Sequence, residues 1–286
     1  MTATNPLGKL LRFREAHPVQ EIHHDGVDWE YIVAGQGAQA LLVLGGAMST
    51  PESSFETIQH YETDFRLIAP AYPPVKTMAA LTDGIVRILT AEGLGQPDSF
   101  QQVHVTGQSL GAGIAHVLIR RHPQFVDKLV LSGFGLYNEQ NTKRARTAMR
   151  MFRLAPYRLI TGYYRKRMRA LLQPAEPEAR EFYLAYMDDL FDRQLNRRKL
   201  IGQFELMADM VDHAAAYRVY EPVERPGRVL ILQAKDDTGF APDEQAALRD
   251  TYPGAQVHIF ESGGHLAGLT QRAEFESLRR AFLIGQ

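Results

Sequence analysis

The sequence predicts an α/β fold, in which a mostly parallel sheet is flanked by helices and a helical segment is inserted into the chain. Short apolar runs of strand type recur, and each leads into a turn with Gly or Pro and then into helix-like sequence. This alternation is typical of βαβ units, which build parallel sheets. The strand pattern stops between Gly133 and Arg225, where helix-forming residues dominate.

The chain is expected to open with an antiparallel hairpin. Residues 19–24 and 29–33 are strand-like, and Asp25-Gly26 between them suits the positive φ angles of a tight turn. Further strands are predicted at 40–44, 65–69, 102–106, 128–132, 228–233 and 256–260. Helices are predicted at 113–121, 243–251 and 271–283.

Composition narrows the class of protein. The chain has 286 residues, 45% hydrophobic and 23% charged, which is enough for one large domain with a sizeable core. A net charge of -1 does not require nucleic acid as a partner. The absence of cysteine excludes disulfides, thiolate metal sites and a cysteine nucleophile. No apolar run approaches the length of about 18 residues that spans a bilayer, and the N-terminus lacks a secretion signal, so we expect a soluble, cytoplasmic protein without stable membrane insertion.

The helical segment divides the predicted domain. We expect residues 1–135 and 226–286 to form the core and residues 136–225 to form the insertion, with breaks at Pro156, Gly162 and the pair Pro174 and Pro177.

The first half of the insertion is basic. No Asp or Glu occurs from residue 140 to residue 175, and the cations are Lys143, Arg144, Arg146, Arg150, Arg153, Arg158, Arg165, Lys166, Arg167 and Arg169. We favour the interpretation that they pair with acids of residues 176–212. The alternative is that they attract an anionic ligand, such as an anionic substrate, a phosphate-bearing acyl carrier or a membrane surface.

A candidate nucleophile lies in Gly107-Gln108-Ser109-Leu110-Gly111, which matches G-x-S-x-G. The segment follows a predicted strand and precedes a predicted helix, the context in which a serine sits in a sharp, strained turn at the edge of the sheet. Glycines two residues to either side let the strand and helix pack closely. Ser109 is therefore our candidate nucleophile.

With this motif in this context, the sequence resembles the α/β-hydrolase superfamily from about Val19 to Leu283, apart from the insertion. The resemblance implies a triad in the chain order serine, acid, histidine. The acid aligns with Asp237, after the strand at 228–233, and Asp236 stays open as an alternative. The histidine aligns with His265 in Ser262-Gly263-Gly264-His265. A serine needs such a base, itself oriented by a third group, to act as a nucleophile.

Acyl transfer also requires donors for the oxyanion of the tetrahedral intermediate. The backbone N–H of Leu110 is the first candidate. The second is expected from the turn Leu44-Gly45-Gly46-Ala47-Met48, where we choose Gly46 and keep Ala47 as the alternative. Many relatives have His-Gly in this turn, so Leu44 departs from the pattern, but a backbone donor tolerates that change.

These residues predict a serine hydrolase that cleaves carboxylic esters or related small acyl substrates and needs no cofactor. No His-x-x-x-His pair or carboxylate cluster indicates a catalytic metal. Two alternatives stay open. One is a C–C bond hydrolase or lyase that uses the same triad. The other is a binding protein, since the chain is similar to maspardin around Glu221-Pro222 and the turn at Ser262.

The insertion resembles the helical cap that shapes the substrate pocket in many members of this superfamily. Its aromatic side chains are Phe152, Tyr157, Tyr163, Tyr164, Phe182, Tyr183, Tyr186 and Phe191. We expect them mainly to pack the insertion against the core, and the alternative is that they line the substrate pocket.

Overall fold

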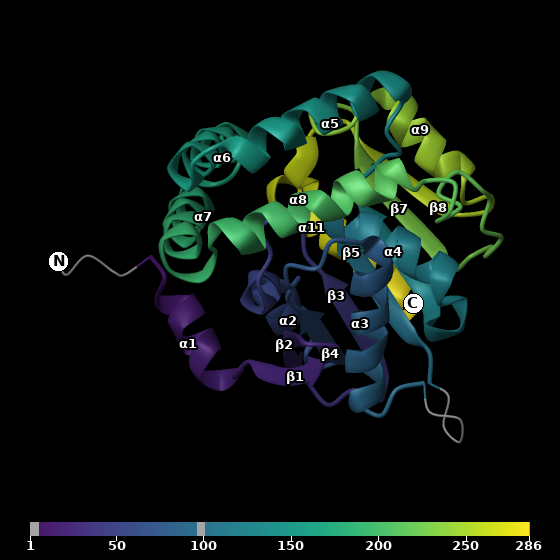
Figure 1. The fold of residues 1–286 in the computed structure, drawn as a ribbon. Coiled ribbons are helices and arrows are strands. Elements are labelled where there is room, and N and C mark those ends of the chain that lie inside the picture. Colours follow the sequence, from purple (N-terminus) through teal and green to yellow (C-terminus); the bar gives the residue numbers. More distant parts are fainter. Residues whose placement is uncertain (1–5, 96–100, 286) are drawn as a thin grey trace.

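The computed structural model describes residues 6–95 and 101–285. Within them, eight strands form one central sheet with helices on both faces (Figure 1). The strands are β1 (Gln20–His24), β2 (Val27–Ala34), β3 (Gln39–Leu44), β4 (Phe65–Pro70), β5 (Val103–Gln108), β6 (Val126–Ser132), β7 (Val229–Ala234) and β8 (Gln256–Phe260). Their order across the sheet is β1-β2-β4-β3-β5-β6-β7-β8.

The sheet is mostly parallel, as the sequence predicts. β1 and β2 form the expected antiparallel hairpin, and its turn residues Asp25 and Gly26 have φ angles of 52° and 73°. β2 also runs antiparallel to β4, whereas every later pairing is parallel. The carboxyl ends of β3, β5, β6, β7 and β8 therefore meet at one edge of the sheet, where α/β proteins commonly bind ligands.

Helices cover both faces of the sheet. The helices of the core are α1 (Gly8–Ala16), α2 (Phe55–Tyr61), α3 (Met78–Ala91), α4 (Leu110–Arg121), α9 (Pro242–Asp250), α10 (Ala267–Thr270) and α11 (Arg272–Ile284). Short 3-10 turns are η1 (Pro51–Ser54), η2 (Pro123–Phe125) and η4 (Gly264–Leu266). Apolar side chains of α3, α4 and α9 pack on one face, and those of α1, α2 and α11 pack on the other. None of the described helices is long and apolar enough to cross a membrane.

Four helices lie between β6 and β7 along the chain, and we call them the insertion helices. They are α5 (Glu139–Leu154), α6 (Tyr157–Leu171), α7 (Pro177–Asp189) and α8 (Arg197–Asp212), with a π-helical turn, η3 (Leu190–Gln194), between the last two. Figure 1 shows α5, α6 and α7 as an outer arc, with α8 inside it and next to α3 and α4. The break predicted at Gly162 is wrong: this glycine lies inside α6, because one helical glycine costs only about 1 kcal/mol and packing of the amphipathic helix outweighs it.

Two histidines are buried in the core. His104 on β5 is 5% exposed, and its Nδ1 lies 3.3 Å from a carboxylate oxygen of Asp127 but outside hydrogen-bonding geometry. Burial lowers the pKa of His104 to about 4, although Asp127 acts in the opposite direction. His116 on α4 is fully buried between the Tyr252 hydroxyl and the Val219 carbonyl, and burial lowers its pKa as well. Both imidazoles are therefore neutral in the folded protein at pH 7.

Acid should destabilise the fold through His104. Its folded-state pKa is about 4, whereas an unfolded histidine titrates near pH ~6.5, so the unfolded chain binds the extra proton first. This contribution to stability is complete above pH ~6.5 and is lost as the pH falls toward ~4. Urea unfolding across this range should give a shallower pH dependence of the unfolding free energy in His104→Gln than in wild type. The exposed His23→Gln is the control, and identical slopes in all three proteins would contradict the assignment.

Candidate active site

Ser109 occupies a strained turn between β5 and α4. Its backbone has φ 52° and ψ -116°, a region that residues with side chains rarely adopt. The turn is fixed at both ends, because the Ser109 N–H donates to the Ser132 carbonyl at 2.9 Å and its own carbonyl accepts from the Gly113 N–H at 3.1 Å. The side chain therefore projects from the carboxyl edge of the sheet.

The two glycines of the motif are required by close packing. A Cβ at Gly107 would lie 2.5 Å from the Gly111 carbonyl oxygen, and one at Gly111 would lie 2.0 Å from the Leu44 carbonyl oxygen. Real Cβ atoms do not approach backbone oxygens so closely. The G-x-S-x-G pattern thus reflects the contact of α4 with β5 and with the end of β3.

His265 and Asp237 meet Ser109 at this edge. The His265 Nε2 lies 2.9 Å from the Ser109 Oγ, and its Nδ1 lies 3.0 Å and 3.2 Å from the two carboxylate oxygens of Asp237. Because a carboxylate only accepts, Nδ1 carries the proton and Nε2 is free to accept from the serine hydroxyl. The side chain of Asp237 is 2% exposed and that of His265 is 13% exposed, so both are sheltered from water.

Asp236 has a different set of contacts. Its carboxylate accepts from the backbone N–H groups of Gly263 and Gly264, at 3.2 Å and 2.8 Å. It therefore fastens the turn that carries His265, while the neighbouring Asp237 contacts the imidazole. Of the two acids that the sequence left open, Asp237 is the one in contact with His265.

Gly239, two residues after Asp237, is a site residue that was not predicted from the sequence. The Gly239 N–H donates to Asp237 Oδ1 at 2.6 Å, and a Cβ on Gly239 would lie 2.5 Å from His265 Nδ1. A side chain there would displace the imidazole or the carboxylate. The D-x-G spacing at 237–239 is a local signal that could have identified it.

The loop after β3 lies beside Ser109. A Cβ at Gly46 would be 3.6 Å from the Ser109 Cβ and 2.5 Å from Gln108 Oε1, so its backbone borders the turn at Ser109. Leu110 is the first residue of α4, where a backbone N–H has no partner inside the helix. Both candidate donors are thus next to Ser109, and Ala47 follows directly in the same loop.

Two side chains that were not predicted from the sequence hold this loop. The buried Tyr72 hydroxyl donates to the Gly45 carbonyl at 2.8 Å. The side-chain amide of Gln203, from α8, accepts from the Met48 N–H at 2.5 Å and donates to the Ser49 carbonyl at 3.1 Å. Met48 has a positive φ of 70°, so the loop is strained as well as fastened.

Two cavities meet at this site. One has a volume of about 380 Å³, reaches Ser109 and is lined by side chains of α5, α6 and α8. The other has a volume of about 280 Å³ and extends toward α2, α7 and α11. Both are lined by His265, Gln108 and the loop Gly46 to Met48. Burial raises the pKa of Tyr137, in the larger cavity, to about 12, so its phenol is neutral.

The sequence pattern of the alpha/beta hydrolase fold family matches residues 87–271, which include the turn, Asp237 and His265. The chain belongs to the α/β hydrolase family.

Individual relatives are distant. A 2-hydroxy-6-oxononadienedioate/2-hydroxy-6-oxononatrienedioate hydrolase of Paraburkholderia xenovorans (strain LB400) is 23% identical over 96% of this chain and 94% of that protein. The structure of a hydrolase from Pseudomonas aeruginosa PA01 matches with a TM-score of 0.73 and 20% identity, covering 93% of this chain and 98% of that one. An enol-lactonase from Burkholderia xenovorans LB400 matches with a TM-score of 0.70 and 13% identity, covering 93% and 100%. These structural likenesses establish the fold.

The insertion helices of this α/β hydrolase use their aromatic side chains in both expected ways. Tyr164 stacks on Phe204 with ring centroids 5.3 Å apart, and Phe182 packs against Phe55 of α2 at 5.3 Å. Of the aromatic side chains that the sequence singled out in the insertion, Phe152, Tyr163 and Tyr164 line the larger cavity, and Tyr183 and Tyr186 line the smaller one. Packing and pocket lining therefore coexist.

The basic run is paired only in part. Arg146 pairs with Asp212, Arg153 with Glu205, and Arg165 with both Asp188 and Asp192, as the favoured interpretation expects. Lys143 pairs with Glu139 on its own helix. Among the described residues no carboxylate lies within ion-pair distance of Arg144, Arg150, Arg158, Lys166, Arg167 or Arg169.

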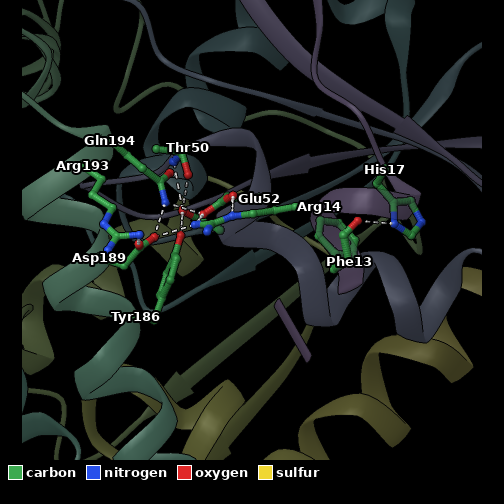
Figure 2. Close-up of polar contacts among 10 residues, drawn as sticks. Phe13, Arg14, His17, Thr50, Glu52, Tyr186, Asp189, Arg193 and Gln194 are labelled. Carbon is green, nitrogen blue, oxygen red and sulfur yellow. Dashed lines mark hydrogen bonds and ion pairs between the residues drawn. The ribbon is translucent and has the colours of Figure 1, made fainter. Parts of the chain in front are cut away.

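A buried polar cluster fastens the insertion to the core of the hydrolase (Figure 2). The Arg14 guanidinium, from α1, lies 2.6 Å from Glu52 of η1 and 2.5 Å from Asp189 at the end of α7. Gln194 donates to both carboxylates, at 2.5 Å and 2.9 Å. Burial opposes ionisation of Asp189, but the hydrogen bonds from Arg14 and Gln194 outweigh it and lower its pKa.

Loss of Arg14 should destabilise the hydrolase strongly. Arg14→Gln leaves two buried carboxylates close together without their cation, which is expected to cost about 3 kcal/mol of unfolding free energy. The matched control is Arg193→Gln, because Arg193 also faces Asp189, at 3.6 Å, but its side chain is 79% exposed. That change should cost about 0.5 kcal/mol or less. Urea unfolding at pH 7 measures both, and equal losses would contradict the cluster's role.

Proposed function

We propose that this α/β hydrolase cleaves carboxylic esters or related small acyl substrates through an acyl-serine intermediate. The observation that carries the proposal is the continuous hydrogen-bonded chain from the Ser109 Oγ through His265 to Asp237, at 2.9 Å and 3.0 Å. A nucleophile, a base and a group that orients the base are the three parts that serine catalysis requires.

In the proposed reaction, His265 Nε2 takes the hydroxyl proton while Ser109 Oγ attacks the substrate carbonyl carbon. The backbone N–H groups of Gly46 and Leu110 donate to the resulting oxyanion. His265 then gives its proton to the leaving alkoxide, and the acyl group stays on Ser109. Water, deprotonated by His265, attacks the acyl-serine. The bond from the acyl carbon to Ser109 Oγ then breaks, His265 returns the proton to Oγ, and the acid is released. Asp237 keeps the imidazole tautomer and stabilises the imidazolium in both halves.

The two cavities favour a substrate that extends on both sides of its reactive carbonyl group. Because both cavities meet at His265 and the loop Gly46 to Met48, an ester carbonyl at Ser109 has space on either side for an acyl group and a leaving group. We propose that residues 136–225 act as a cap that shapes this space, since α5, α6 and α8 line the larger cavity and α7 lines the smaller one.

A C–C bond hydrolase is the second candidate. It is favoured by the full-length relative from Paraburkholderia xenovorans, whose name describes hydrolysis of a 2-hydroxy-6-oxo dienedioate. The enol-lactonase neighbour favours ester chemistry instead. A binding-only role, as in the maspardin comparison, gains no support from a serine, a histidine and a buried acid held within hydrogen-bonding distance of one another.

Covalent labelling tests the nucleophile. A fluorophosphonate probe should label the wild-type protein and should not label Ser109→Ala, because no other serine among residues 6–95 and 101–285 has a histidine within hydrogen-bonding distance of its hydroxyl. Turnover of p-nitrophenyl esters of rising acyl length should fall at least about 10³-fold in the same variant. Labelling is read by mass spectrometry of the intact chain.

Two outcomes would contradict this proposal. Folded wild-type protein that stays unlabelled would exclude an activated serine and favour a binding role. Labelled protein that hydrolyses a vinylogous 1,5-diketone but no ester of the panel would replace the ester assignment with C–C bond hydrolysis.

Substitution of the two neighbouring acids should lower kcat to different extents. Asp237→Asn removes the negative charge beside the imidazole and replaces one carboxylate oxygen with an NH2 donor, so it favours the wrong His265 tautomer, and kcat for the best ester should fall about 10⁴-fold. Asp236→Asn keeps an acceptor for the Gly263–Gly264 turn and should lower kcat less than about tenfold. The two variants carry the same Asp-to-Asn change at adjacent positions, so each variant is the control for the other. A larger loss in Asp236→Asn would reverse the assignment.

A further inference from the structure

Exposed apolar side chains gather where α5 ends and α6 begins. Among the described residues, the most exposed large apolar side chains include Leu154 at 87%, Leu159 at 68% and Met151 at 67%, with Tyr163 at 48% close by. All four fall within 13 consecutive residues. We call the exposed side chains of residues 150–163 the corner surface. Such a concentration on a protein surface commonly marks a site of interaction.

The corner surface is continuous because of helical spacing. Met151 and Leu154 lie three residues apart in the last turn of α5, and Leu159 and Tyr163 lie four apart in α6, so each pair shares a face. Only two extended residues, Ala155 and Pro156, separate α5 from α6, which keeps the two pairs close in the chain. Figure 1 shows this corner at the outer rim of the molecule, away from the sheet.

Cations surround these apolar side chains. Arg150 and Arg158 flank the corner, and Lys166 follows on α6, all three exposed and without a carboxylate within ion-pair distance in the described part of the chain. No Asp or Glu occurs from residue 140 to residue 175. The combination of protruding apolar side chains with unpaired cations is typical of surfaces that enter the headgroup region of anionic membranes.

Charge favours a membrane over a second copy of the chain. A symmetric dimer through the corner surface would bring Arg150 and Arg158 of both copies together, and like charges in an interface repel. An anionic bilayer instead neutralises these cations and accepts Leu154 and Leu159 among its headgroups and upper acyl chains.

The corner surface also borders the larger cavity. Phe152 and Tyr163, from its two helices, line the cavity of about 380 Å³ that reaches Ser109. When the corner surface rests on a bilayer, the rim of that cavity therefore lies at the lipid interface.

We propose that the corner surface docks the protein reversibly on anionic lipid bilayers. Met151, Leu154 and Leu159 supply the apolar contact, and Arg150, Arg158 and Lys166 supply the electrostatic attraction. The docking is peripheral and independent of the reaction at Ser109.

Vesicle co-sedimentation tests the docking. The full chain should bind vesicles of phosphatidylcholine with 30 mol% phosphatidylglycerol and should bind pure phosphatidylcholine at least about tenfold more weakly. Raising the salt concentration to about 0.5 M should release it, because exposed charges are then screened. Leu154→Ser with Leu159→Ser, and separately Arg150→Gln with Arg158→Gln, should each weaken binding about tenfold or more.

Matched controls keep the test decisive. Leu11→Ser with Val19→Ser removes exposed apolar side chains elsewhere and should leave vesicle binding unchanged. Unfolding temperatures and labelling of Ser109 report whether each variant is folded. The proposal is overturned if folded wild type ignores anionic vesicles, if the corner variants bind as wild type does, or if Leu154→Ser with Leu159→Ser instead abolishes a dimer seen by analytical ultracentrifugation.

Discussion

The close approach of three backbone segments at Ser109 is the constraint on which the rest of the site depends. Helix α4 lies so near the end of β3 that Gly111 has no room for a Cβ beside the Leu44 carbonyl. This contact requires the chain to turn sharply from β5 into α4, and Ser109 takes the positive φ that the turn demands. The strain is tolerable because β5 is paired on both sides in the middle of the sheet.

The same edge explains why distant residues meet. Strand β7 pairs in parallel with β6, and β8 pairs in parallel with β7, so the turns that follow them lie at the same edge and bring Asp237 and His265 to Ser109 without long excursions of the chain. Two further residues then fix the position of the imidazole. Asp236 holds the Gly263–Gly264 turn, and Gly239 leaves space for the ring. The geometry at the site is thus a product of sheet topology first and of local hydrogen bonds second.

Much of this arrangement could be predicted from the sequence, for identifiable reasons. Buried parallel strands are continuous apolar runs, and the nucleophile turn needs two glycines that leave a pattern within five residues. The sequence favours Asp237 over Asp236 only through the resemblance to the family, because both follow the same strand and only the turn's conformation decides which faces the ring. Helix α1 was not expected, since its burial of Leu10 and Phe13 against α2 leaves no strong local pattern. The catalytic roles themselves stay predictions.

The insertion helices show where local sequence stops being informative. Gly162 predicts a break, yet α6 continues because its apolar face packs against α7 and α8. Gln203 is one polar residue on α8, and nothing around it in the sequence indicates that its amide holds both sides of the loop beside Ser109. Arg14 likewise gains its role only when α1, η1 and α7 converge. Residues of this kind fasten the insertion to the loop after β3, so the walls of the cavities and the backbone beside Ser109 form one connected unit. The chemistry can be inferred from local motifs, whereas the shape offered to a substrate arises from contacts between segments more than 100 residues apart.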